Sequence, residues 1–173
     1  APAAAESLTV SGGTLLLSHS DTTQGDLTIS GGSFGATMDN GGAKVKSLTY
    51  SGGKLVFATE GFYGELPNSI AVEGKFSKDT LEKIVIDFSG LDAETLIGEP
   101  AMTLITAGSF EGMLTSVDAD EYFAAENLIN AIADFAWNGN SLTVAFTQVP
   151  EPAALAAIIG AIALAVCAIR RRR

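Results

Sequence analysis

Residues 8–13 read Leu-Thr-Val-Ser-Gly-Gly, and the motif returns at 27–32 as Leu-Thr-Ile-Ser-Gly-Gly and at 48–53 as Leu-Thr-Tyr-Ser-Gly-Gly. The periods are 19 and 21 residues. Apolar residues also recur at matching offsets beyond the glycines, first at Leu15, Phe34 and Leu55, then at Leu17, Ala36 and Phe57. Alternation of apolar with polar residues predicts strands with one inward face, and each Gly-Gly pair predicts a sharp corner.

A strand, a corner and a second strand in about twenty residues are typical of one coil of a parallel β-solenoid. We therefore expect residues 1–59 to form right-handed β-helix-like coils. Leucine would stack on leucine, Val10 on Ile29 and Tyr50, and Ser-Gly-Gly on Ser-Gly-Gly. An antiparallel β-sandwich built from hairpins stays open as an alternative, because Gly-Gly is also a hairpin turn signal. The matched phase of three copies favours the solenoid. If the corners need unusual backbone angles, valine at Gly12, Gly31 or Gly52 is expected to destabilise them.

Residues 60–148 contain no fourth Ser-Gly-Gly copy, and we expect irregular strands and a capping region there. Strand-like runs cover 70–76, 81–88 and 102–107. Asn138-Gly139 is a turn signal that precedes an alternating run. A helix is predicted over 118–137, because apolar residues recur there at helical spacing. The alternating run contains Leu142, Val144 and Phe146, and the helical set is Tyr122, Leu128, Ile129, Ile132 and Phe135.

The C-terminal segment combines a proline-rich break, an apolar stretch and a basic end. Residues 153–169 are seventeen uncharged, mostly apolar residues. As a helix they would span roughly 25 Å, slightly less than a bilayer core of about 30 Å. We expect one transmembrane helix there, preceded by Val149, Pro150, Glu151 and Pro152 and followed by a cytoplasmic stop of Arg170, Arg171, Arg172 and Arg173. Because positive charge stays in the cytoplasm, everything before Pro150 is predicted to lie outside.

These three parts together resemble the PEP-CTERM sorting signal of Gram-negative-type bacteria. The resemblance covers residues 149–173 and implies that an exosortase, a membrane transpeptidase-like enzyme, recognises the tail. It implies export, cleavage near Pro-Glu-Pro, and delivery to the cell surface or an exopolysaccharide matrix. Export needs a signal peptide and residues 1–30 contain none, so we expect the 173 residues to be part of a longer precursor.

A second resemblance concerns the body of the protein. The runs 86–91 (Ile-Asp-Phe-Ser-Gly-Leu), 104–108 (Leu-Ile-Thr-Ala-Gly) and 137–142 (Trp-Asn-Gly-Asn-Ser-Leu) resemble autotransporter-like β-strand-repeat passengers that carry this tail. That resemblance implies a surface protein with a β-solenoid body. It does not imply self-secretion, because the sequence carries no sign of a translocator barrel.

Charge and cysteine usage narrow the partners and the compartment. All twenty acidic residues precede Pro152 and all four arginines follow it, so the exported part has six lysines against twenty carboxylates, a formal charge of −14. Such a surface repels nucleic acid and fits a soluble extracellular body. The single cysteine, Cys167, lies in the apolar stretch. Stability must therefore come from packing and hydrogen bonds rather than from disulfides.

Candidate catalytic groups are few. His19 is the only histidine, and Cys167 lies in the predicted membrane helix, so zinc sites and Cys-His nucleophiles are excluded. Two acidic clusters, Asp118/Asp120/Glu121 and Asp39/Asn40, are candidates for a glycan-cleaving or calcium site. Neither cluster matches a calcium-loop motif. We therefore predict no catalytic, cofactor-binding or metal-binding residue and no cofactor.

The sequence favours a non-catalytic surface or extracellular-matrix protein, such as an adhesin, held in the membrane by its tail until exosortase processing. Two alternatives stay open. One is a glycan-degrading β-solenoid enzyme with a carboxylate site, and the other is a membrane-anchored adhesin whose tail is never processed.

Overall fold

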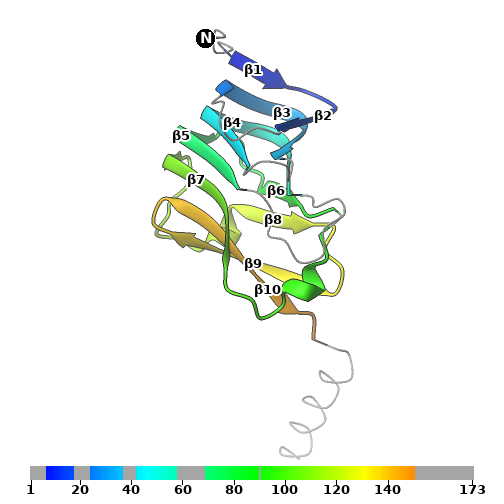
Figure 1. Ribbon diagram of the computed structural model, residues 1–173. Coiled ribbons are helices and arrows are strands. Elements are labelled where there is room, and N and C mark those ends of the chain that lie inside the picture. Colours follow the sequence, from blue (N-terminus) through cyan, green and yellow to red (C-terminus); the bar gives the residue numbers. More distant parts are fainter. Residues whose placement is uncertain (1–6, 18–23, 37–41, 58–68, 90, 151–173) are drawn as a thin grey trace, which may run out of the picture.

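The computed structural model describes residues 7–17, 24–36, 42–57, 69–89 and 91–150 (Figure 1). These residues are mainly β, and their ten strands belong to one large sheet. In chain order the strands are β1 (Ser7–Val10), β2 (Thr14–Leu17), β3 (Gln24–Ala36), β4 (Ala43–Val56), β5 (Ile70–Lys78), β6 (Ile84–Asp87), β7 (Met102–Glu111), β8 (Phe123–Glu126), β9 (Ala131–Asn138) and β10 (Ser141–Gln148). Two short 3-10 helices, η2 (Ala93–Leu96) and η3 (Ala119–Glu121), interrupt them.

The predicted transmembrane helix, 153–169, lies outside these ranges, as do Glu151, Pro152 and the four arginines 170–173. Among the helices of the described residues, none is long and apolar enough to cross a bilayer.

The three sequence repeats lie side by side as parallel strands. β1 pairs with β3 and β3 pairs with β4, both in parallel, and the repeats are aligned position by position. The aligned sets are Leu8, Leu27 and Leu48, and then Val10, Ile29 and Tyr50. This register confirms the predicted stacking of equivalent residues. The antiparallel pairing of neighbouring repeats, which the sandwich alternative requires, does not occur in them.

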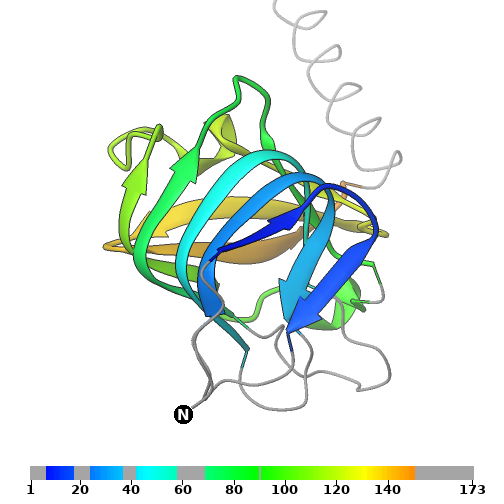
Figure 2. The same cartoon turned by 90° about the horizontal axis from the view of Figure 1, so that it is seen from above.

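Each repeat bends at its glycines, so the stack has two arms. The first arm contains β1, residues 24–29 of β3, residues 43–50 of β4, and then β5 and β7. The second arm contains β2, the ends of β3 and β4, and then β6 and β8. All of these neighbours pair in parallel. Seen from above, β3 and β4 curve around the corner between the arms (Figure 2).

The corner is closely packed because the backbones of successive repeats nearly touch. Gly32 has a φ of +66°, and a Cβ placed on it would lie 2.5 Å from the carbonyl oxygen of Gly13. Gly53 has a φ of +91°, and a Cβ there would lie 2.6 Å from the oxygen of Gly32. The expected stacking of the three Ser-Gly-Gly triplets is only approximate, because the register shifts at the corner and Ser30 pairs with Gly52.

Strands predicted in the middle of the chain are present. β5 and β7 include the predicted runs 70–76 and 102–107 and extend beyond them, whereas β6 covers only residues 84–87 of the run 81–88. The turn signal at Asn138-Gly139 is also confirmed, because β9 and β10 form an antiparallel hairpin there. Leu142, Val144 and Phe146 are buried on β10, as their alternation predicted.

The predicted helix over 118–137 is wrong. This segment contains η3, β8 and β9. Asn127 and Asn130 have φ values of 59° and 55°, which a continuous helix cannot accommodate. On β9 the more buried side chains alternate with exposed ones, which is the period of a strand. The apolar residues at helical spacing are therefore shared between a strand and the loop before it.

The β9–β10 hairpin lies at the opposite end of the stack from β1 (Figure 1). β10 pairs antiparallel with β7, so the hairpin ends the parallel series of the first arm. Aromatic rings join the hairpin to the stack. Phe123 lies 5.8 Å from Phe135 and 5.8 Å from Trp137, while Phe110 lies 4.8 Å from Trp137, all between ring centroids. The buried core of the stack thus continues into the hairpin.

Candidate functional site

The predicted sorting motif begins where the chain leaves the folded body. β10 ends at Gln148, and Val149 and Pro150 follow as exposed residues without regular structure. The amide of Val149 donates a hydrogen bond of 3.4 Å to the carbonyl of Asn130. Val149 and Pro150 are the only two of the eight predicted tail residues that belong to the described part of the chain. Both are on the surface.

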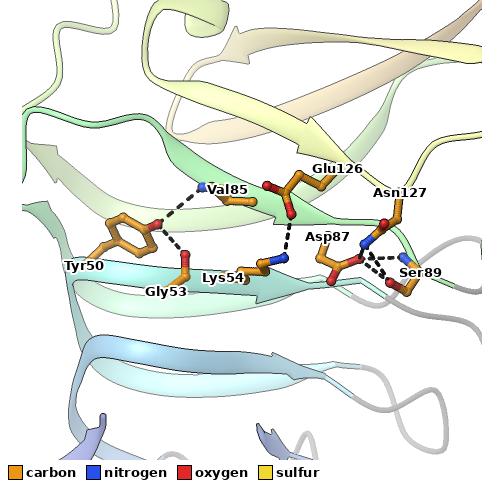
Figure 3. A network of polar contacts seen from close by, with 8 residues as sticks. All are labelled: Tyr50, Gly53, Lys54, Val85, Asp87, Ser89, Glu126 and Asn127. Carbon is orange, nitrogen blue, oxygen red and sulfur yellow. Dashed lines mark hydrogen bonds and ion pairs between the residues drawn. The ribbon is translucent and has the colours of Figure 1, made fainter. Parts of the chain in front are cut away.

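A polar network covers the outer side of the second arm (Figure 3). Lys54 on β4 and Glu126 on β8 form an ion pair, with 2.6 Å between Nζ and Oε2. The pairing register places Lys54 beside Val85 on β6, so the lysine reaches diagonally over β6 to the next strand. Both side chains are about two-fifths exposed, at 40% and 44%. The pair therefore joins three layers of the stack from outside.

Asp87, at the end of β6, is the second centre of this network. Its Oδ1 accepts hydrogen bonds from the Asn127 amide at 2.8 Å, from the Ser89 backbone amide at 2.8 Å and from the Ser89 hydroxyl. Partial burial raises the pKa of Asp87, but the hydrogen bonds from Asn127 and Ser89, helped by Lys54, outweigh it and hold the pKa below its ordinary value. The carboxylate is therefore ionised and fixed in place.

Tyr50 connects the network to the corner. Its hydroxyl donates to the carbonyl of Gly53 at 2.6 Å and accepts a bond of 3.4 Å from the amide of Val85. Burial raises the pKa of the Tyr50 hydroxyl, against the bond from Val85, and the nearby carboxylates of Glu82 and Glu126 add to the increase. The neutral phenol thus bridges β4 and β6 at the point where the chain turns.

The contacts of two carboxylates in this network hold strands and a turn together. Asp87 and Glu126 occupy paired positions on β6 and β8, but one carboxylate holds a turn and the other neutralises Lys54. A glycosidase needs one carboxyl group with a raised pKa as the general acid. Asp87, whose pKa is lowered, is therefore not suited to be that acid.

The acidic cluster considered from the sequence has structural contacts. Asp118 Oδ1 accepts the backbone amide of Asp120 at 3.2 Å and so caps η3. Asp120 Oδ1 in turn accepts the backbone amide of Phe135 at 3.1 Å and ties η3 to β9. His19 and the Asp39/Asn40 pair lie outside the described residues. Within those residues, no group of three or more His, Cys, Asp or Glu side chains is arranged to hold a metal ion.

The contacts of Lys54 and Asp87 were missed by sequence reasoning. Lys54 and Glu126 are 72 residues apart, and no repeat motif marks β6 or β8 as neighbours of β4. Comparison with protein-family models, with curated proteins and with solved structures found no match.

Proposed function

We propose that this chain is a non-catalytic exported protein with a right-handed β-helix-like solenoid body and a PEP-CTERM sorting tail at 149–173. Support for the solenoid comes from the parallel pairing of neighbouring strands along both arms, from β1 to β7 and from β2 to β8, and from the alignment of the three repeats. The β9–β10 hairpin would serve as the cap of this solenoid. Such a body acts as a structural or adhesive unit at the cell surface or in an extracellular matrix.

The observation that carries the sorting proposal is the exit of the chain at Val149-Pro150. Both residues are exposed directly after the last strand. A residue that precedes proline favours an extended conformation, which suits a processing enzyme that must bind the chain from outside the body. The apolar stretch 153–169 and the arginines 170–173 would hold the protein with the body outside the cytoplasm until an exosortase acts.

Processing can be tested by intact mass. The full chain is produced in a bacterium with and without an exosortase-type enzyme, and the mass of the protein is measured after extraction. The proposal expects loss of the C-terminal arginines only when the enzyme is present, and Pro152→Ala should reduce that loss strongly. Pro100→Ala, an exposed proline in a body loop, is the matched control. A chain that keeps Arg173 in both hosts would contradict the proposal and favour the unprocessed anchor.

The proposal that the protein is not an enzyme has a separate test. The extracted protein is incubated with acidic and neutral polysaccharides, and release of reducing or unsaturated ends is measured. The proposal expects none above the background of the Asp87→Asn and Glu126→Gln variants. Turnover that disappears in either variant would instead establish a glycan-cleaving enzyme on the second arm.

A further inference from the structure

The layer formed by β1 and β2 is the end of the stack farthest from the hairpin (Figure 1). In the described part of the chain, each of these two strands has a single neighbouring strand, β3. Strand edges of this kind are templates for pairing with another chain, and proteins usually protect them with charge, proline or bulges. The β1–β2 edge is here defined as residues 7–17.

This edge has none of those protections. Residues 7–17 contain no charged residue and no proline, although the exported part of the chain carries twenty carboxylates. Leu8 is 39% exposed and Leu16 is 46% exposed. The other two strands with one neighbour, β8 and β9, carry the exposed acids Glu126 and Asp134. The β1–β2 edge is thus a neutral, partly apolar end on an acidic body.

The glycines at this edge provide an independent observation. In the second repeat, a Cβ on Gly31 would lie 2.7 Å from the oxygen of Ser11, so the neighbouring repeat requires glycine there. The equivalent Gly12 has no atom within 4 Å of such a Cβ, and its φ is not positive. Nothing among the described residues therefore requires glycine at this position. The corresponding backbone surface at Gly31 is the one against which the first repeat packs its corner. At Gly12 this surface is open among the described residues.

We propose that the β1–β2 edge pairs head to head with the β1–β2 edge of a second copy of this chain. A two-fold axis between Gly12 and Gly13 would place corner on corner and β1 against β2 of the other copy. The paired strands would be antiparallel, because β1 runs toward the corner and β2 runs away from it. Val10 would lie opposite Leu15 of the second copy, so core residues meet core residues. Such self-complementary two-fold contacts are the commonest form of oligomer.

A head-to-tail stack is less compatible with the fold. At the other end of the first arm, β7 is already paired with β10 in the antiparallel sense. A second copy would have to displace the hairpin to continue the parallel series. β10 ends at the opposite end of the body from β1 (Figure 1), so head-to-head pairing would leave the two chain exits at opposite ends of the dimer. Such a dimer suits copies on two facing surfaces or copies released from the membrane. The pairing deepens the adhesive role proposed above, and the contact itself does not involve the tail.

Cross-linking across the paired strands tests the geometry. The full chain with Cys167→Ser, Thr9→Cys and Leu16→Cys is extracted in mild detergent and oxidised, and dimers are counted on a non-reducing gel. Thr9 and Leu16 are exposed, and the proposed axis places Thr9 of one copy opposite Leu16 of the other, so two cysteines come within reach of a disulfide. The expected result is a disulfide-linked dimer as the main species. Thr115→Cys, an exposed residue in the loop between β7 and β8, is the control and should stay mostly monomeric.

Sedimentation of the unmodified chain and of two charge variants tests the energetics. Leu8→Glu buries a carboxylate in the proposed contact and should weaken dimerisation by at least about tenfold. Ile132→Glu, at a residue of similar exposure (43%) on the edge strand β9, should leave it unchanged. A monomeric parent chain, for example because residues 1–6 or a further coil cover the edge, would overturn the proposal. A dimer that resists Leu8→Glu and gives no cross-link between positions 9 and 16 would overturn it as well.

Discussion

Glycine is required at the corner by two separate effects, and Gly32 combines them. Its φ of +66° is strained for any L residue, and the backbone of Gly12 and Gly13 occupies the space of a side chain. We expect Gly32→Ala to lower the free energy of unfolding by at least about 2 kcal/mol. Urea denaturation measures this loss.

Gly12→Ala is the matched control, since its backbone angle is ordinary and its surroundings are open. It should change stability by less than about 1 kcal/mol in the monomer. Equal losses in the two variants would contradict the stacking of the corners. The structure thus revises the sequence expectation that glycine is needed at Gly12 as well as at Gly31, because a sequence motif cannot say which repeat has a neighbouring strand on each side.

The buried hydroxyl of Tyr50 leads us to expect that stability falls at alkaline pH. Burial raises its pKa above the ordinary value of about 10. Because the folded-state pKa is higher than the unfolded one, the contribution of Tyr50 is complete below about pH 10. It is lost as the pH rises through the folded-state pKa. We expect the melting temperature of the native chain to fall more steeply above pH 10 than that of Tyr50→Phe.

The same variant has a cost at neutral pH. Tyr50→Phe leaves the Gly53 carbonyl and the Val85 amide without the hydroxyl and should lose about 1 kcal/mol at pH 7. Tyr122→Phe is the control, because the Tyr122 hydroxyl accepts one bond from the exposed Leu114 amide. If Tyr50→Phe and the native chain lose stability in parallel up to pH 11, the phenol does not carry the effect.

At the scale of elements, the β9–β10 hairpin depends on a few aromatic contacts with the stack. Phe135 is buried and packs against Phe123 of β8. Phe135→Ala should destabilise the protein by about 3–5 kcal/mol, and Ile132→Ala, at an exposed position three residues earlier, by less than about 1 kcal/mol. Chemical denaturation followed by the fluorescence of Trp137, the only tryptophan, gives both values. Similar losses would mean that the hairpin does not rest on the core.

The elements also mark the limits of sequence reasoning. The parallel pairing of the three repeats could be predicted, because equivalent residues recur at matching offsets and pair with one another. The segment 118–137 could not, because Leu128 and Ile129 fall at helical spacing by coincidence. The usable signal was the alternation of Ala131, Ala133, Phe135 and Trp137 before the Asn138-Gly139 turn. The Lys54–Glu126 contact was beyond reach, since it needs the order of strands in the second arm.

At the scale of the whole molecule, charge and topology carry the functional account. The body is acidic, the last segment is apolar and then basic, and the chain leaves the body at the end opposite β1. The proposed placement of the body outside the cytoplasm agrees with the four arginines that follow the apolar stretch, because positive charge next to a membrane helix stays in the cytoplasm. Sequence alone was enough to propose this polarity, and the structure adds the exposed exit at Val149-Pro150.

Labelling of intact cells that make the protein tests this polarity most directly. A membrane-impermeant amine reagent is applied before lysis, and the modified lysines are identified by mass spectrometry. Lys75 is exposed on β5, and the account predicts that it is labelled in intact cells as fully as in lysed ones. Labelling of Lys75 only after lysis would place the body in the cytoplasm and contradict the account.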